Sequence, residues 1–205
     1  MKIIKLKPDK EHLHGATLAQ QHLRSVQNEL NSLNGDPTIF LLDLTRAKSV
    51  TGSYLRATVL WALLSGRADA ANTPTNGHVE KWAVRPLPIF PSIIAKSPEL
   101  LDDVDDFFSA RNLPILLALA HNSTGLTSAR LLGSLDSFLV STLTRLVRHK
   151  QATAAELADA SEEAITVNAW SNRLADLHLF RLVTRERSGK FWRYAPLAKE
   201  ITLWA

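Results

Sequence analysis

The expected fold depends most on residues 153–196, TAAELADASEEAITVNAWSNRLADLHLFRLVTRERSGKFWRYAP. Thr153 is a favourable helix N-cap, and Glu156 three residues later completes a capping box, so a short helix is expected over residues 154–160. A longer helix is expected over residues 165–179, where apolar side chains recur at steps of three and four. Its predicted buried face consists of Val167, Trp170, Leu174 and Leu177.

Two short strands with a tight turn are expected after this helix, over residues 182–186 and 190–194. Ser188 and Gly189 lie between them, and a two-residue loop that contains glycine is a strong hairpin signal. With this loop, Arg187 would pair with Lys190 and Arg185 with Trp192. The second pair predicts a cation–π contact between the guanidinium and the indole.

A further helix is expected upstream, over residues 135–149, since apolar side chains again recur at helical spacing. Three helices followed by a basic hairpin is the order of a winged helix-turn-helix domain. Residues 152–161, ATAAELADAS, resemble the second helix of bacterial regulators of that family. Residues 165–197 resemble their recognition helix and wing. The resemblance implies an α+β winged helix-turn-helix domain over residues 134–205, with double-stranded DNA as its partner.

The candidate DNA contacts follow from the expected buried face of the recognition helix. Residues on the opposite face near the helix start would meet base edges, where Asn suits adenine and Arg suits guanine. The candidates there are Asn168, Asn172 and Arg173 for bases, and Ser171 for bases or phosphate. In the hairpin, the candidates for the phosphate backbone or the minor groove are Arg185, Arg187 and Lys190, and Arg193 completes the DNA-binding set.

The charge distribution favours the same surface. The net charge is only +4, but residues 181–193 hold five basic residues and one acid. Clustered positive charge favours phosphate backbones through counterion release. Winged helices also serve as protein-interaction modules, so two hypotheses stay open. One is a DNA-binding transcriptional regulator, and the other is a non-enzymatic adaptor or scaffold subunit in which both domains bind proteins.

The first two thirds of the chain predict a different kind of domain. Strand patterns and helix patterns alternate, which indicates an α/β sheet with helices covering it. The expected strands are residues 2–6, 38–43 and 113–120, and the expected helices are residues 15–33, 53–64 and 97–111. The continuous apolar run at 38–43 indicates a strand buried on both faces. Residues 67–80 have loop composition, and Pro86, Pro88 and Pro91 predict an edge strand or irregular chain.

Residues 40–60, FLLDLTRAKSVTGSYLRATVL, resemble the sulfate-transporter and anti-sigma-factor-antagonist (STAS) superfamily, especially its bacterial STAS-like branch. The resemblance implies a STAS-like domain over residues 1–133 that binds a protein partner or a second copy of the chain, so a homodimer stays open. It also places Ser53 where the antagonists carry a regulatory phosphoserine. The family's Asp-Ser-Ser-Gly is replaced here by Thr51-Gly52-Ser53-Tyr54. A simple helix N-cap at Ser53 or Thr51 is the alternative.

Other function classes lack their sequence signals. The chain has no cysteine, which excludes disulfides, thiolate metal sites and a cysteine nucleophile. Motifs of zinc proteases, phosphate-binding loops and serine hydrolases are absent, and glycine is scarce. We therefore expect no enzyme, no cofactor and no metal. No apolar run approaches the about 20 residues of a membrane span, and no signal peptide is evident, so a cytoplasmic protein without a membrane partner is expected.

Overall fold

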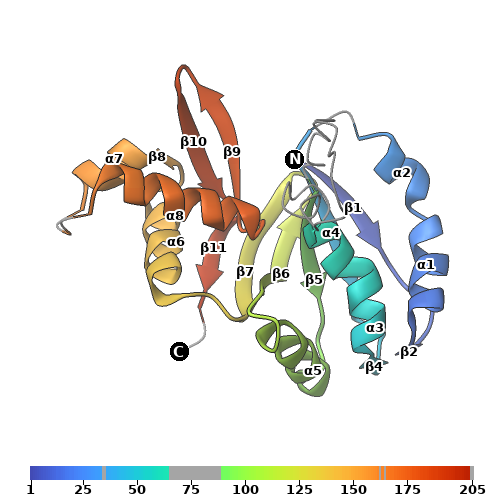
Figure 1. Cartoon of the computed structure of the whole chain (residues 1–205). Coiled ribbons are helices and arrows are strands. Elements are labelled where there is room, and N and C mark those ends of the chain that lie inside the picture. Colours follow the sequence, from blue (N-terminus) through green and yellow to red (C-terminus); the bar gives the residue numbers. More distant parts are fainter. Residues whose placement is uncertain (34–35, 65–88, 162, 164, 204–205) are drawn as a thin grey trace, which may run out of the picture.

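A six-stranded mixed sheet forms the centre of the protein (Figure 1). The computed structural model describes all residues except 34–35, 65–88, 162, 164 and 204–205. The sheet order is β1 (Lys2–Leu6), β3 (Thr38–Asp43), β5 (Ile89–Ile94), β6 (Pro114–Asn122), β7 (Gly125–Gly133) and β11 (Ala198–Thr202). The pairs β1–β3, β3–β5, β5–β6 and β7–β11 are parallel, and only β6–β7 is antiparallel. The protein is thus a mixed α/β structure, as the alternating patterns predicted.

The first face of the sheet is covered by helices that follow its strands in the sequence (Figure 1). These are α1 (Ala16–Arg24), α2 (Gln27–Asn31), α3 (Gly52–Leu55), the π-helical turn η1 (Arg56–Leu60), α4 (Trp61–Leu64) and α5 (Pro98–Ser109). Phe40 and Leu42 of β3 point into the apolar core beneath them. A small parallel pair, β2 (His12–Leu13) with β4 (Ser49–Val50), lies at the periphery.

The C-terminal elements lie on the side of the second face of the sheet, and their buried residues share one apolar cluster with that face. These elements are α6 (Ser137–His149), β8 (Ala152–Thr153), α7 (Ala154–Asp159), α8 (Val167–Leu179), β9 (Val183–Ser188) and β10 (Phe191–Pro196). Ile39 and Leu41 of β3 and Phe90 of β5 share one buried cluster with Trp170 and Leu174 of α8. Every residue of β3 is buried, so the prediction of a strand covered on both faces is confirmed.

The last strand connects the two parts of the chain. The expected domain boundary between residues 133 and 134 lies between β7 and α6. Strand β11 comes from the C-terminal side of that boundary, yet it pairs in parallel with β7 from the N-terminal side. The central sheet therefore contains strands from both sides of the boundary. Neither β11 nor the β6–β7 hairpin was expected from the sequence.

Strand β5 corrects an expectation drawn from proline. Pro91 predicted an edge strand or irregular chain, but β5 lies between β3 and β6 in the sheet. A proline removes one backbone donor only, and the pairing with β6 begins at Ser92, just after it. The ladder therefore tolerates Pro91 in a central strand. Pro86, Pro88 and the expected loop at 67–80 lie outside the described residues.

The long helix expected over residues 15–33 is also wrong in one respect, because it is interrupted. The amides of Ser25 and Val26 donate to the carbonyls of His22 and Leu23, three residues back rather than four. Val26 then adopts φ −112° and ψ 5°, which ends α1 and starts α2. By contrast, α5 begins as expected at Ser97, whose Oγ accepts from the amide of Leu100 at 3.3 Å. No helix within the described residues is long and apolar enough to cross a membrane.

Candidate nucleic-acid interface

The start of α8 and the β9–β10 hairpin border one groove of about 250 Å³. Asn168 and Ser171 line it from the helix, and Lys190 lines it from the turn of the hairpin. Three of the residues expected to contact DNA thus lie around a single cavity. The groove is also lined by Val167, Phe191 and Trp192, and by residues of β8, α7 and β10.

Helix α8 separates a buried face from an exposed one. Trp170, Leu174 and Leu177 are fully buried, as their spacing predicted. The prediction for Val167 is wrong, because this residue is 46% exposed. The helix begins at Val167 rather than at residue 165, so Val167 occupies the first turn, beyond the packed part of the buried face. The Thr166 side chain caps this end, accepting from the amide of Ala169 at 3.3 Å.

The exposed face carries the polar residues expected to read bases. Asn168, Ser171 and Asn172 are exposed. Arg173 is half-buried, with its guanidinium carbon 5.4 Å from the ring centre of Phe138 on α6 and 5.5 Å from that of Trp170. Arg173 therefore lies against the aromatic rings, whereas the other three side chains are open to solvent.

The hairpin has a different register from the expected one. Ser188 pairs with Phe191 and Arg187 with Trp192, so the loop consists of Gly189 and Lys190. Gly189 has φ +62°, a backbone conformation that favours glycine, and it takes the first loop position. The expected pairs of Arg187 with Lys190 and of Arg185 with Trp192 are therefore wrong.

The expected cation–π contact is nevertheless confirmed. The guanidinium carbon of Arg185 lies 4.4 Å from the ring centre of Trp192. That of Arg187 lies 4.2 Å from the same ring. Arg185 reaches the indole diagonally across the ladder, which long side chains can do. One tryptophan thus holds two exposed arginines on one face of the hairpin.

Arg193 projects from the hairpin toward α7 and pairs with an acid. Its Nη2 lies 2.9 Å from Oε1 of Glu156. The other oxygen of Glu156 accepts from the amide of Thr153 at 2.7 Å, which confirms the predicted capping box. This backbone hydrogen bond, together with the charge of Arg193, lowers the pKa of the Glu156 carboxyl. Arg193 therefore contributes less free positive charge than the sequence suggested.

Arg181 also differs from the sequence-based expectation of a basic cluster. It is buried, with 5% exposure, and its guanidinium carbon lies 5.7 Å from the ring centre of Phe90. The exposed basic surface is thus Arg185, Arg187 and Lys190, which we call the wing cations. No carboxylate in the described part of the chain forms an ion pair with them.

Ser53 lies on the other side of the sheet from this groove, in helix α3. It is exposed, and its Oγ is 3.0 Å from Oγ1 of Thr51. Thr51 occupies the N-cap position, but no side chain caps this helix. Thr51 Oγ1 accepts instead from the amide of Gly15 at 3.1 Å. Ser53 is therefore one residue inside the helix and is not its N-cap.

Sequence reasoning missed Phe191 as part of the groove. Its side chain is 59% exposed and lines the groove beside Lys190. The sequence signal was Gly189, because glycine favours the first position of a two-residue loop. A loop at Gly189–Lys190 makes Phe191 the first residue of the returning strand. The register error concealed it.

Comparison of the chain with models of known protein families, with curated proteins and with solved structures finds no match. Among the described residues, no group of three or more His, Cys, Asp or Glu could hold a metal ion. The geometry of the groove and its charges are therefore the basis for a functional proposal.

Proposed function

We propose that the C-terminal elements form a winged helix-turn-helix domain that binds double-stranded DNA. In this proposal α8 is the recognition helix in the major groove, and the β9–β10 hairpin is the wing on the phosphate backbone or in the minor groove. The observation that carries the proposal is that the polar start of α8 shares one groove with Lys190 and Trp192 of the wing, and that Arg185 and Arg187 lie on the ring of Trp192. Neither surface is covered by the central sheet, since both are exposed.

The proposed role is regulation of transcription in the cytoplasm. The N-terminal part would act as a STAS-like regulatory or dimerisation domain, binding a protein partner or a second copy of the chain. No catalytic step is part of this proposal. Asn168 and Asn172 would contact base edges, and Arg173 would do so after leaving the ring of Phe138. Ser171 would contact a base edge or a phosphate.

One observation favours the adaptor hypothesis as a second candidate. Val167 and Phe191 place two exposed apolar side chains in the same groove as the polar ones. Apolar side chains contact thymine methyl groups in DNA, but they are also the usual anchors of a protein interface. DNA binding is favoured because Lys190 borders the groove, Arg185 and Arg187 lie on the ring of Trp192 that lines it, and no described acid forms an ion pair with these three cations.

The test is fluorescence anisotropy of labelled duplex DNA at two salt concentrations. The variant replaces Arg185, Arg187 and Lys190 with alanine. A matched control replaces Lys7, Lys10 and Arg46, three exposed basic residues of the N-terminal part, so both proteins lose the same charge. We expect salt-sensitive binding by the wild type and the control, and a weaker salt dependence in the wing variant.

Two outcomes would overturn DNA binding through the wing. The first is no binding by the wild type at low salt, which would favour the adaptor hypothesis. The second is an equal loss of affinity in the wing variant and the control. That result would indicate a general effect of net charge rather than a located interface.

A further inference from the structure

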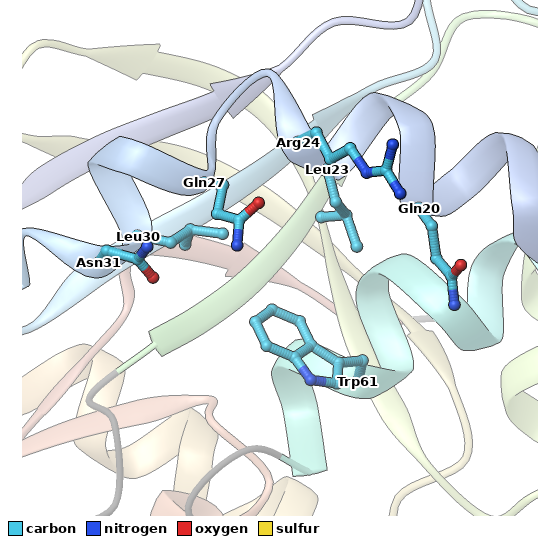
Figure 2. Close-up of a pocket in the computed structure, with 7 residues that line it drawn as sticks. All are labelled: Gln20, Leu23, Arg24, Gln27, Leu30, Asn31 and Trp61. Carbon is cyan, nitrogen blue, oxygen red and sulfur yellow. The ribbon is translucent and has the colours of Figure 1, made fainter.

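A second groove, of about 340 Å³, lies between α1 and α2 on one side and α4 on the other, among the helices that cover the first face of the sheet (Figure 2). Gln20, Leu23 and Arg24 line it from α1, and Gln27, Leu30 and Asn31 from α2. Trp61 of α4 lies across from them, as Figure 2 shows. The volume falls within the range of about 300–1,000 Å³ that small-molecule sites usually have.

Two irregular helical segments shape this groove. The break at Ser25 and Val26 ends α1 and starts α2, and both helices contribute side chains to the same groove. On the other wall, the π-helical turn η1 directly precedes Trp61. A π turn contains one more residue than an α turn and thereby changes which later side chains face the core, and such turns are frequent at functional sites.

The exposed indole is the apolar feature of the groove. Leu60, Ala62 and Leu63 around it are buried, whereas Trp61 is 42% exposed. Leu23 and Leu30 are only partly buried and lie in the same groove. An indole face in such a place can stack against a planar ring, and aromatic pairs prefer this kind of contact.

The polar side chains that line the groove indicate which charge and which polar groups a ligand should have. Among the described residues that line the groove, Arg24 is the only ionisable one, and it forms no ion pair with a described carboxylate. An unneutralised guanidinium favours an anion. The amides of Gln20, Gln27 and Asn31 offer donors and acceptors, which suits the polar edge of a heteroaromatic ring.

We propose that this groove binds a small planar aromatic anion. The ring stacks on Trp61 next to Leu23 and Leu30, the anionic group pairs with Arg24, and the neighbouring amides bond the ring edge. A purine nucleotide and an aromatic carboxylate share this chemistry. The site is independent of the DNA proposal, because none of its residues belongs to the groove between α8 and the hairpin.

The test is isothermal titration calorimetry of the full chain with AMP, GMP and indole-3-acetate. Two control ligands each lack one part of a nucleotide. Adenosine lacks the charged group, and inorganic phosphate lacks the ring. We expect saturable binding of at least one aromatic anion, with each control ligand about tenfold weaker or more. Preference for a nucleotide or for the carboxylate then distinguishes the two sources of the ligand.

Variants locate the binding. Trp61→Ala should weaken the binding about tenfold, and Trp61→Phe should retain most of it because a ring remains. Arg24→Ala should weaken the binding of AMP but leave the binding of adenosine unchanged. Arg46→Ala, at an exposed arginine elsewhere, should change neither affinity. The side chains of Trp61, Arg24 and Arg46 are exposed, so folding should be unaffected in all four variants.

Three results would overturn the proposal. One is the absence of saturable binding by any of the aromatic anions up to about 1 mM. Another is binding that Trp61→Ala leaves unchanged, which would place it elsewhere. The third is self-association that Trp61→Ala abolishes in a protein that binds none of the probes, which would indicate that a second copy of the chain covers the groove.

Discussion

The two faces of the central sheet are covered in different ways. The first face is packed by helices that immediately follow the strands they cover. The second face is covered by elements that start at Ser137, which follows five of the six sheet strands in the sequence. In β3, Phe40 and Leu42 point to the first layer, and Ile39 and Leu41 to the second. The C-terminal unit is therefore a structural layer of the protein as well as the proposed DNA-binding unit.

This difference matters most for α8, which has two separate roles. Its inner residues, among them Trp170, contribute to the core on the second face. Its outer residues, among them Asn168, form the proposed base-reading surface. Near the C-terminal end of α8, the ring centre of His178 lies 6.0 Å from that of Phe90 on β5. A change at the sheet can thus act directly on α8, the proposed recognition helix.

The largest expected loss of stability comes from truncating Trp170, the largest fully buried side chain in the cluster on the second face. Trp170 is fully buried, so Trp170→Ala should lower the free energy of unfolding by about 3–5 kcal/mol. Urea unfolding should show one transition, and hydrogen exchange of the β3 amides should increase with that of α8. Val167→Ala, an exposed apolar change on the same helix, should have a much smaller effect. Unchanged protection of β3 would mean that the two faces unfold separately.

A smaller effect is expected from pH at the junction of α8 with the sheet. Burial lowers the pKa of His178 to about 4, and its Nδ1 lies 2.9 Å from the carbonyl oxygen of Val183. In the unfolded chain its pKa is about 6.5, so the unfolded state gains a proton first as the pH falls. Stability should therefore be complete above about pH 6.5 and decrease by roughly 2–4 kcal/mol toward pH 4.

The control for this prediction is His178→Asn, which keeps a donor for the Val183 carbonyl but cannot gain a charge. Chemical unfolding at several pH values between about 4 and 7 should give a flatter profile for the variant. The carboxylates titrate in both proteins, so their contribution to the pH dependence of stability cancels in the comparison. Parallel profiles would show that His178 is protonated equally in the folded and unfolded chains, and would weaken the case for a tightly packed junction.

Elements with strong local signals were predicted well from the sequence. The capping box at Thr153 and Glu156, the N-cap at Ser97 and the buried run of β3 each depend on a few neighbouring residues. Strand β11 was missed because its five residues, AKEIT, have no strong pattern, and its partner β7 lies about 70 residues earlier. Long-range pairing of this kind leaves little trace in a local window.

The candidate site shows the same limit. Asn168, Ser171 and Lys190 were predicted individually, and the groove that brings them together follows from packing of α8 beside the hairpin. Arg181 and Arg193 were counted as surface charge, but burial and the pairing with Glu156 are tertiary features. Pro91 was misjudged because its effect depends on where the pairing with β6 begins. Burial and register, rather than residue type, account for these errors.

The next prediction concerns the outer side of α8, and it rests on the proposed DNA binding. Once a preferred site has been selected from random duplexes, Asn168→Ala should reduce discrimination at one base pair by about 1–3 kcal/mol. Arg187→Ala should instead weaken binding to all sequences alike and reduce the salt dependence. Competition anisotropy with single-base variants of the site separates the two effects. If Asn168→Ala acted equally on every sequence, its assignment to base reading would fail.

The smallest expected effect compares matched helix caps on the two faces. Thr153 Oγ1 accepts from the amide of Glu156 at 3.2 Å at the start of α7, in the C-terminal unit. Ser97 Oγ caps α5 on the first face in the same way. Thr153→Ala and Ser97→Ala should each cost about 1 kcal/mol. Because both layers pack on one sheet, each variant should shift the same single unfolding transition, and the double variant should show the sum. A transition that splits in only one variant would show that the layer carrying that cap unfolds independently of the sheet.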